Sequence, residues 1–160
     1  SLVRNIVEFP AAPKRGQKQT AHSFIIFFPA NFSPGKGHIF ALQAFKRLLE
    51  LVDNVLLVMA GQRFPNIQSE QLLCTLRELI GSSLMAENVN LVVDQTDLSE
   101  YYTNCDLVWM LSEAESFSRV CCEAAVFQKG LVATRCGGPQ SFLVDGSTAM
   151  LVDFGDVEDT

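Results

Sequence analysis

The sequence predicts an α/β domain, built as a doubly wound parallel sheet with helices on both faces. Short apolar segments without polar alternation, such as Phe24–Phe28, are typical of strands buried on both faces of a parallel sheet. Segments with helical spacing separate these strands, and that alternation forms βαβ units. Apolar residues make up 48% of the 160-residue chain, which is enough for one core. Together these observations favour a Rossmann-like fold.

The first half of the chain is expected to contain three strands and two helices. The strands are Phe24–Phe28, Val55–Met59 and Val89–Val93. The helices lie between them, at Ile39–Val52 and Ile67–Ile80, where apolar residues recur on one helix face. Gly81 follows the second helix and is a usual signal for a helix end.

The second half continues the alternation in shorter pieces. Strands are expected at Cys105–Leu111, Leu131–Thr134 and Ala149–Val152. Helical segments are expected at Asp97–Tyr102, Phe117–Gln128 and Pro139–Val144. We expect Trp109 in the core, and we expect Tyr101 and Tyr102 to pack with their hydroxyls toward solvent.

The N-terminal segment predicts a domain boundary. A short apolar piece, Leu2–Phe9, is followed by Pro10–Pro13 and by the basic polar run Lys14–Gln19. Clusters of proline and polar residues are typical of linkers. We therefore expect residues 1–21 to be an inter-domain linker or the end of a missing N-terminal domain, and residues 22–160 to form one domain.

Composition and charge exclude several classes of protein. The formal net charge is −6 without a block of like charges, which argues against a nucleic-acid-binding protein with a basic face. The five cysteines lack the spacing of a zinc site or a redox motif, so reduced thiols in a cytoplasmic protein are expected. We find no export signal and no apolar run long enough to span a bilayer.

Ser112–Gly138 is the candidate site, because it joins two expected strands and ligands bind at the carboxyl ends of such strands. Glu115 and Glu123 lie eight positions apart, on either side of the expected helix start at Phe117. A helix N-terminus binds anions, and Glu123 would lie roughly 9 Å further along the axis. Two acids around an anion site could bracket a nucleotide-sugar. Two surface glutamates on an amphipathic helix are the alternative.

The loop Pro29–Gly37 leaves the first strand and is a second candidate. Lys36 lies near a helix start, where an ammonium can pair with a phosphate, although a solvated lysine is the alternative. The loop matches neither the GxxxxGK[ST] nor the GxGxxG pattern. His38 is expected on the surface at the helix start. The loop Asp94–Leu98 follows the third strand and is a candidate for contacting a base.

The spacing Glu115-x7-Glu123 resembles the donor domain of a known enzyme family. With Ala124, Gly130, Gly137–Gly138 and the loop Pro29–Gly37, it is similar to the C-terminal domain of retaining glycosyltransferases of the GT-B fold, most closely family 4. The resemblance covers about Phe24–Val152. It implies that residues 22–160 form a nucleotide-sugar-binding domain.

The resemblance also implies roles for individual residues. Lys36 and Glu115 would form the catalytic set, with Lys36 on the distal phosphate and Glu115 on the transferred sugar. Glu123 would accept the ribose hydroxyls, and the N–H groups of Arg119 and Val120 would meet the diphosphate. The remaining donor-contacting residues would be Asn31, Gly35, Gly61, Thr96, Leu98, Phe117 and Ser118.

The implied reaction is transfer of a hexosyl group from a donor such as a UDP- or GDP-sugar, with retention of configuration. The acceptor, a glycan or a lipid-linked sugar, would lie on a missing N-terminal domain, and the isolated domain would be inactive. No cofactor, metal or nucleic acid is implied, and the cytoplasmic full-length enzyme could associate peripherally with a membrane. Chemistry would rest on electrostatic stabilisation of the leaving diphosphate.

Four positions depart from the usual pattern of the family: Asn31, Ser118, Leu131 and Ser141 stand where arginine, glycine, proline and glutamate are common. Asn31, Ser118 and Ser141 leave open the alternative of a non-catalytic, partner-binding module with a decayed donor site. A nucleotide-sugar epimerase of the same fold is a second alternative, because it would use the same donor half.

Overall fold

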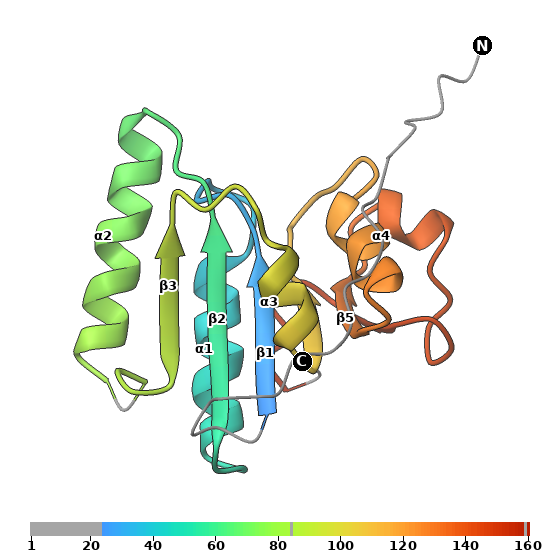
Figure 1. The fold of residues 1–160 in the computed structure, drawn as a ribbon, viewed down its shortest axis with the longest axis horizontal. Coiled ribbons are helices and arrows are strands. Elements are labelled where there is room, and N and C mark those ends of the chain that lie inside the picture. Colours follow the sequence, from blue (N-terminus) through green and yellow to red (C-terminus); the bar gives the residue numbers. More distant parts are fainter. Residues whose placement is uncertain (1–23, 84, 159) are drawn as a thin grey trace.

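The computed structural model describes residues 24–83, 85–158 and 160, and within them six parallel strands form one sheet (Figure 1). The strands lie in the order β3-β2-β1-β4-β5-β6. Their bounds are β1 Phe24–Pro29, β2 Val55–Gly61, β3 Val89–Val93, β4 Leu107–Met110, β5 Gly130–Thr134 and β6 Met150–Val152. This order confirms the predicted doubly wound sheet. The expectations for residues 1–21 lie outside the described residues.

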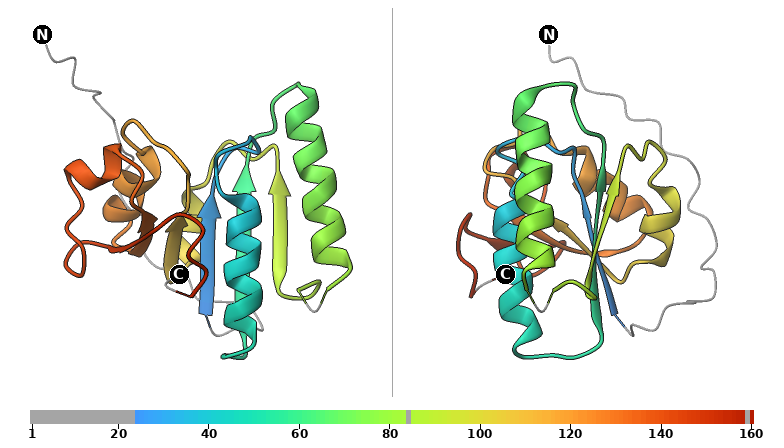
Figure 2. Two further views of the ribbon diagram at one scale, coloured as in Figure 1. Left: turned by 180° about the vertical axis from the view of Figure 1, so that it is seen from behind. Right: turned by 90° about the vertical axis from the view of Figure 1, so that its left-hand side faces the viewer.

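Within the described residues, helices α1 to α4 cover the two faces of the sheet, as the turned view in Figure 2 shows. Helices α1 (His38–Leu49) and α2 (Ile67–Gly81) pack on one face, and α3 (Ser99–Asn104) and α4 (Arg119–Val126) on the other. Successive strand residues point to opposite faces, so Phe28 packs with the first helix pair and Phe27 with the second. The apolar runs are therefore continuous because both faces are covered.

Several element bounds differ from the sequence prediction, and three of these differences are instructive. The helix expected at Phe117 begins at Arg119, because Ser118 has a φ of 69°, which no right-handed helix accommodates. The strand expected at Cys105–Leu111 is the shorter β4, since Cys105 instead follows the last turn of α3. The helix expected at Pro139–Val144 is only a 3₁₀ turn, η1 (Gly138–Ser141).

Trp109 is buried in β4, which confirms its predicted place in the core. The predicted surface position of His38 is wrong. His38 is 2% exposed and lies between the rings of Phe28 and Phe32. Gly37, with a φ of 80°, turns the chain so that the first residue of α1 faces the sheet. Burial lowers the pKa of His38 to about 4, which keeps the imidazole neutral near pH 7.

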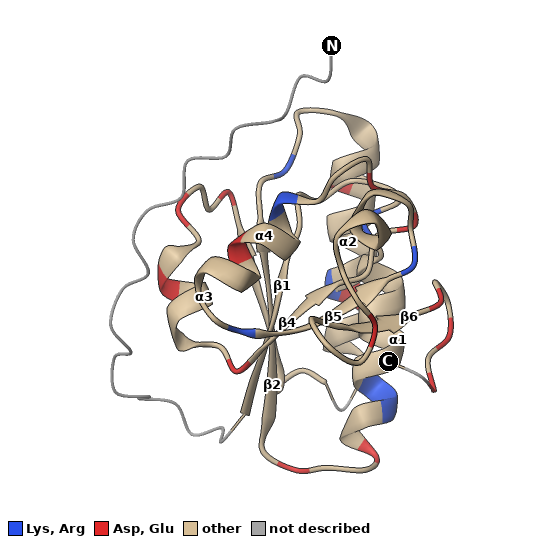
Figure 3. Ribbon diagram, turned by 90° about the vertical axis from the view of Figure 1, so that its right-hand side faces the viewer, with Lys and Arg blue, Asp and Glu red and all other residues tan. Residues whose placement is uncertain are grey.

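The ribbon in Figure 3 shows Lys and Arg positions and Asp and Glu positions interspersed over several elements. No described helix is both long and apolar enough to cross a membrane. No disulfide links the cysteines, and only Cys74 among them is exposed.

Candidate functional site

The predicted site residues meet in one cleft of about 710 Å³ at the carboxyl ends of the strands. The cleft lies where the strand order reverses between β1 and β4, the place where doubly wound sheets bind ligands. Every predicted residue except Gly35 lines it. These residues are Asn31, Lys36, Gly61, Thr96, Leu98, Glu115, Phe117, Ser118, Arg119, Val120 and Glu123.

Lys36 and Glu115 form an ion pair across the cleft. The Lys36 ammonium lies 2.6 Å from Glu115 Oε1, although the two residues are 79 positions apart in the chain. The Ser112 hydroxyl donates to the same oxygen at 2.9 Å. The two charged side chains are 33% and 18% exposed, so the pair is reachable from the cleft but shielded on its far side. A ligand phosphate that binds Lys36 must therefore share it with a carboxylate.

The Lys36 loop is held against the loop that follows β4. The Glu113 N–H donates to the Gly35 carbonyl at 2.8 Å. A Cβ on Gly37 would overlap the Leu111 carbonyl, so only glycine permits this approach. Gly35 thus lies behind the cleft and positions Lys36, instead of lining the cleft itself.

The Glu115 loop is fixed from the other side by the segment after β5. The Glu115 N–H donates to the Cys136 carbonyl at 3.0 Å, and the Gly138 N–H donates to the Glu115 carbonyl at 2.7 Å. A Cβ on Gly138 would overlap the backbone of Ser116. These bonds hold Glu115 in place at its backbone, while Lys36 and Ser112 orient its carboxylate.

The N-terminus of α4 opens into the same cleft. Ser118 is its N-cap residue, yet the Ser118 side chain makes no capping hydrogen bond. The first N–H groups of a helix have no partner within the helix, and they carry partial positive charge. Arg119 and Val120, the first two helical residues, both line the cleft. Their N–H groups and Lys36 together make an environment suited to an anion.

Glu123 lies on α4 with its carboxylate held by two partners. The Tyr102 hydroxyl donates to Oε2 at 2.8 Å, and Arg119 donates to Oε1 at 3.2 Å. The expectation of a solvent-facing Tyr102 hydroxyl is wrong, because the Tyr102 ring is buried beneath α4. Burial, and then the Glu123 charge, raise the pKa of Tyr102 far above its ordinary value. Since α4 begins at Arg119, Glu123 lies only about 6 Å along the axis, closer to the anion site than expected.

A comparison with protein families decides the class of this chain. The family model of the glycosyl transferases group 1 matches residues 13–160. The chain belongs to this family.

Two curated glycosyltransferases are 30% identical to the chain. One is the lipopolysaccharide 1,2-N-acetylglucosaminetransferase of Salmonella typhimurium, matched over 78% of this chain and 33% of its own length. The other is the N-acetyl-alpha-D-glucosaminyl L-malate synthase of Bacillus anthracis, matched over 82% of this chain and 32% of its own length. The chain therefore spans about a third of these relatives.

Solved structures of GT-B glycosyltransferases share the fold. Anabaena HepE in complex with UDP has a TM-score of 0.76 at 23% identity, covering 87% of this chain and 37% of that one. The C-terminal domain of the group 1 glycosyl transferase LpcC of Francisella tularensis has a TM-score of 0.76 at 18% identity, covering 86% and 71%. The predicted resemblance to a GT-B domain of this family is thus confirmed.

In this group 1 glycosyltransferase chain, the far end of the cleft is lined by short polar loops. The Asn31 side chain accepts a hydrogen bond from the Gln62 N–H at 3.2 Å. Asn31, at the position where the sequence comparison expects arginine, thus links the loop after β1 to the loop after β2. Gln95 donates to the Asp97 carbonyl at 2.9 Å. The Ser99 N–H, which Asp97 accepts, lowers the pKa of the Asp97 carboxyl. Thr96 and Leu98 lie between these bonds, beside the cleft.

Several residues of the cleft had no role assigned to them individually from the sequence, among them Gln62, Gln95, Tyr102 and Ser112, although Gln95 and Ser112 lie within the candidate segments. Three of them follow a strand directly or nearly so, and the strand-end rule could have found them. Tyr102 lies on a helix, and its hydroxyl carried no sequence signal. No group of three or more metal-ligating side chains lies together in the described part of the chain.

Proposed function

We propose that this chain binds the nucleotide-sugar donor of an enzyme that transfers a hexosyl group with retention of configuration. The observation that carries the proposal is the arrangement of the cleft. Lys36 and the N-terminus of α4 line the same cleft as two carboxylates, Glu115 and Glu123, and α4 begins between these two acids in the chain. An acid on either side of an anion site suits a ligand with a sugar and a ribose on either side of a diphosphate.

Each ligand group has a chemically matched partner in this arrangement. The N–H groups of Arg119 and Val120 and the Lys36 ammonium would take the diphosphate, whose charge grows as the sugar leaves. Glu115 would accept hydroxyls of the transferred sugar. Glu123 would accept the ribose hydroxyls. Base contacts would come from the loop that carries Thr96 and Leu98.

We propose a UDP-sugar as the donor, ahead of a GDP-sugar. Structures of the similar Anabaena protein hold UDP, UDP with glucose, and UDP-glucose. The two curated relatives carry N-acetylglucosamine in their names. Because these relatives are about three times longer than the chain, the acceptor site is proposed to lie on a further domain. We propose a glycan or lipid-linked acceptor, a cytoplasmic enzyme and peripheral membrane association.

Calorimetric titration of the chain with UDP, GDP and the corresponding nucleotide-glucose donors tests the donor site. We expect UDP to bind, and UDP-glucose to bind with an added contribution from Glu115. Binding of neither nucleotide would contradict the proposal and favour a non-catalytic module. Product analysis with the full-length enzyme tests the reaction, since a free epimerised sugar in place of a glycoside would show a different enzyme.

A further inference from the structure

The Tyr102 ring is buried beside the cleft and packed against two aromatic rings. It is 2% exposed, stacks on Phe127 at 5.1 Å between centroids and meets Phe27 edge-on at 4.9 Å. Tyr102 lines the cleft, and its hydroxyl donates to Glu123 at 2.8 Å. A phenol held on two sides by aromatic rings presents its hydroxyl in one place.

The two helices that carry this pair are tied together. Lys129, in the turn after α4, donates to the carbonyls of Thr103 and Cys105 at 2.8 Å each. Those carbonyls belong to the C-terminal end of α3, next to Tyr102. The position of the Tyr102 hydroxyl relative to α4 is therefore maintained by contacts on both helices.

The Glu123 carboxylate keeps unused acceptor capacity. A carboxylate offers about four lone-pair sites, two on each oxygen. Tyr102 occupies a site on Oε2 and Arg119 occupies a site on Oε1. Each oxygen thus retains one site, and Glu123 lines the cleft. Two adjacent acceptor sites match the two adjacent hydroxyls of a ribose.

We propose that Tyr102 is a positioning residue, whose buried hydroxyl holds the Glu123 carboxylate in the orientation that accepts both ribose hydroxyls. The inference rests on the proposed nucleotide-sugar function and assigns the ribose specificity of that site to a Tyr102–Glu123 unit. Arg119 is the weaker support, because its side chain is 75% exposed and its charge is screened by solvent and salt. Tyr102 is neutral, so it orients the carboxylate without neutralising it.

Removing one hydroxyl tests the inference. Tyr102→Phe keeps the ring between Phe27 and Phe127 and deletes only the donor. Binding is measured by calorimetry with UDP and with 2′,3′-dideoxy-UDP, which lacks both ribose hydroxyls. We expect Tyr102→Phe to weaken UDP about three- to tenfold, and to leave dideoxy-UDP within about twofold. If UDP does not bind and GDP does, GDP and its dideoxy form replace them.

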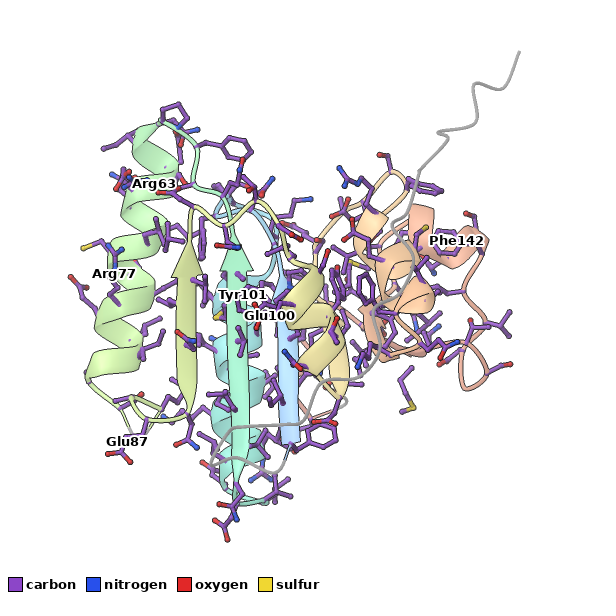
Figure 4. The ribbon with its side chains drawn as sticks, in the orientation of Figure 1. Arg63, Arg77, Glu87, Glu100, Tyr101 and Phe142 are labelled. Carbon is purple, nitrogen blue, oxygen red and sulfur yellow. The ribbon has the colours of Figure 1, made fainter. Side chains whose placement is uncertain are left out.

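Tyr101→Phe is the matched control. Tyr101 lies next to Tyr102 on α3, where Figure 4 labels it beside Glu100, and its ring stacks on Phe27 at 5.6 Å. Its hydroxyl has no hydrogen-bond partner among the described residues, and it does not line the cleft. Deleting that hydroxyl is expected to change the affinity for neither ligand.

The outcomes separate this inference from the proposed function. If the chain binds UDP and Tyr102→Phe weakens UDP and dideoxy-UDP equally, or neither, Tyr102 is only a packing residue and the inference fails alone. If the chain binds neither UDP nor GDP, the proposed function fails and the inference fails with it.

A measurement on the unmodified chain covers the case in which Tyr102→Phe does not fold. The Tyr102 hydroxyl proton, buried and bonded to a carboxylate, should exchange slowly enough to be observed by nuclear magnetic resonance. We expect its resonance to shift on addition of UDP and to stay in place with dideoxy-UDP. An unmoved resonance at saturating UDP would overturn the inference.

Discussion

The two carboxylates of the cleft are supported in opposite ways. Glu115 lies on a loop, and its main partner is a cation, Lys36, which comes from the end of another strand. Glu123 lies on a helix, and its buried partner is the neutral phenol of Tyr102. The Glu115 charge is therefore offset by a direct ion pair, whereas the only cationic partner of Glu123 among the described residues is the 75% exposed Arg119. An anionic ligand that binds Lys36 competes with Glu115, and its competition with Glu123 for Arg119 is weakened by solvent.

The largest expected effect is the pH dependence of folding stability. It arises at His38, beside the loop that carries Lys36. His38 follows the Lys36 loop directly, and burial lowers its pKa to about 4. The unfolded chain takes up a proton near pH 6.5 and the folded chain does not, so stability is complete above about pH 7 and falls toward pH 4. The loss at pH 4 is about 3 kcal/mol from this group. Urea unfolding across this range measures it.

His38→Gln is the matched variant for the pH measurement, because glutamine cannot take up the proton. Its stability at pH 7 is expected to be lower, but its further loss between pH 7 and pH 4 should be smaller by about the same 3 kcal/mol. An unchanged pH slope in this variant would show that other groups control the acid response.

Lys36→Ala should weaken both UDP and UDP-glucose by about ten- to a hundredfold, since a charge-assisted bond to phosphate is lost. The effect should be larger at low ionic strength, because the Lys36 side chain is one-third exposed and salt screens its charge. Calorimetry at two salt concentrations checks this. Lys46→Ala, which removes an exposed charge of α1 away from the cleft, is the control and should change neither affinity. If Lys36→Ala and Lys46→Ala changed the UDP affinity equally, Lys36 would not be the lysine that binds the phosphate.

Glu123→Gln should weaken UDP binding by about tenfold, because hydrogen bonds from ribose to a carboxylate become bonds to a neutral amide. Glutamine preserves the size of the side chain and can still accept the Tyr102 hydroxyl. Glu100→Gln, on the exposed side of α3, is the control for a lost acidic charge. If Glu123→Gln weakened only the binding of UDP-glucose and not of UDP, Glu123 would contact the sugar, contrary to the proposed roles of the two acids.

Glu115→Gln should have the smallest effect on the bare nucleotide. The affinity for UDP is expected to stay within about threefold or to rise, because Lys36 loses a competing carboxylate. UDP-glucose should bind more weakly than to the unmodified chain, and transfer by the full-length enzyme should slow. Parallel titrations with both ligands provide the test. A tenfold loss for bare UDP would mean that the two acids do not differ as proposed.

Much of this protein follows from local sequence. The strands could be predicted from runs such as Phe24–Phe28, because a strand covered on both faces needs apolar residues at every position. Glu115, Glu123 and Lys36 could be placed at strand ends, since all parallel strands of one sheet deliver their carboxyl ends to the same edge. The fold class and the edge that carries the site are thus properties of the sequence pattern alone.

The remaining features depend on contacts between distant segments. The Lys36–Glu115 pair joins residues 79 positions apart, and it forms only because Gly37 and Gly138 let three loops approach. The start of α4 depends on the backbone at Ser118, whose φ of 69° no propensity predicts. His38 begins α1 and Tyr102 lies on the short helix α3, and nothing in the neighbouring sequence predicts that either polar side chain is buried. Only the packing of α1 and α3 against the sheet buries them, because burial is decided by what lies opposite a residue and not by its own chemistry.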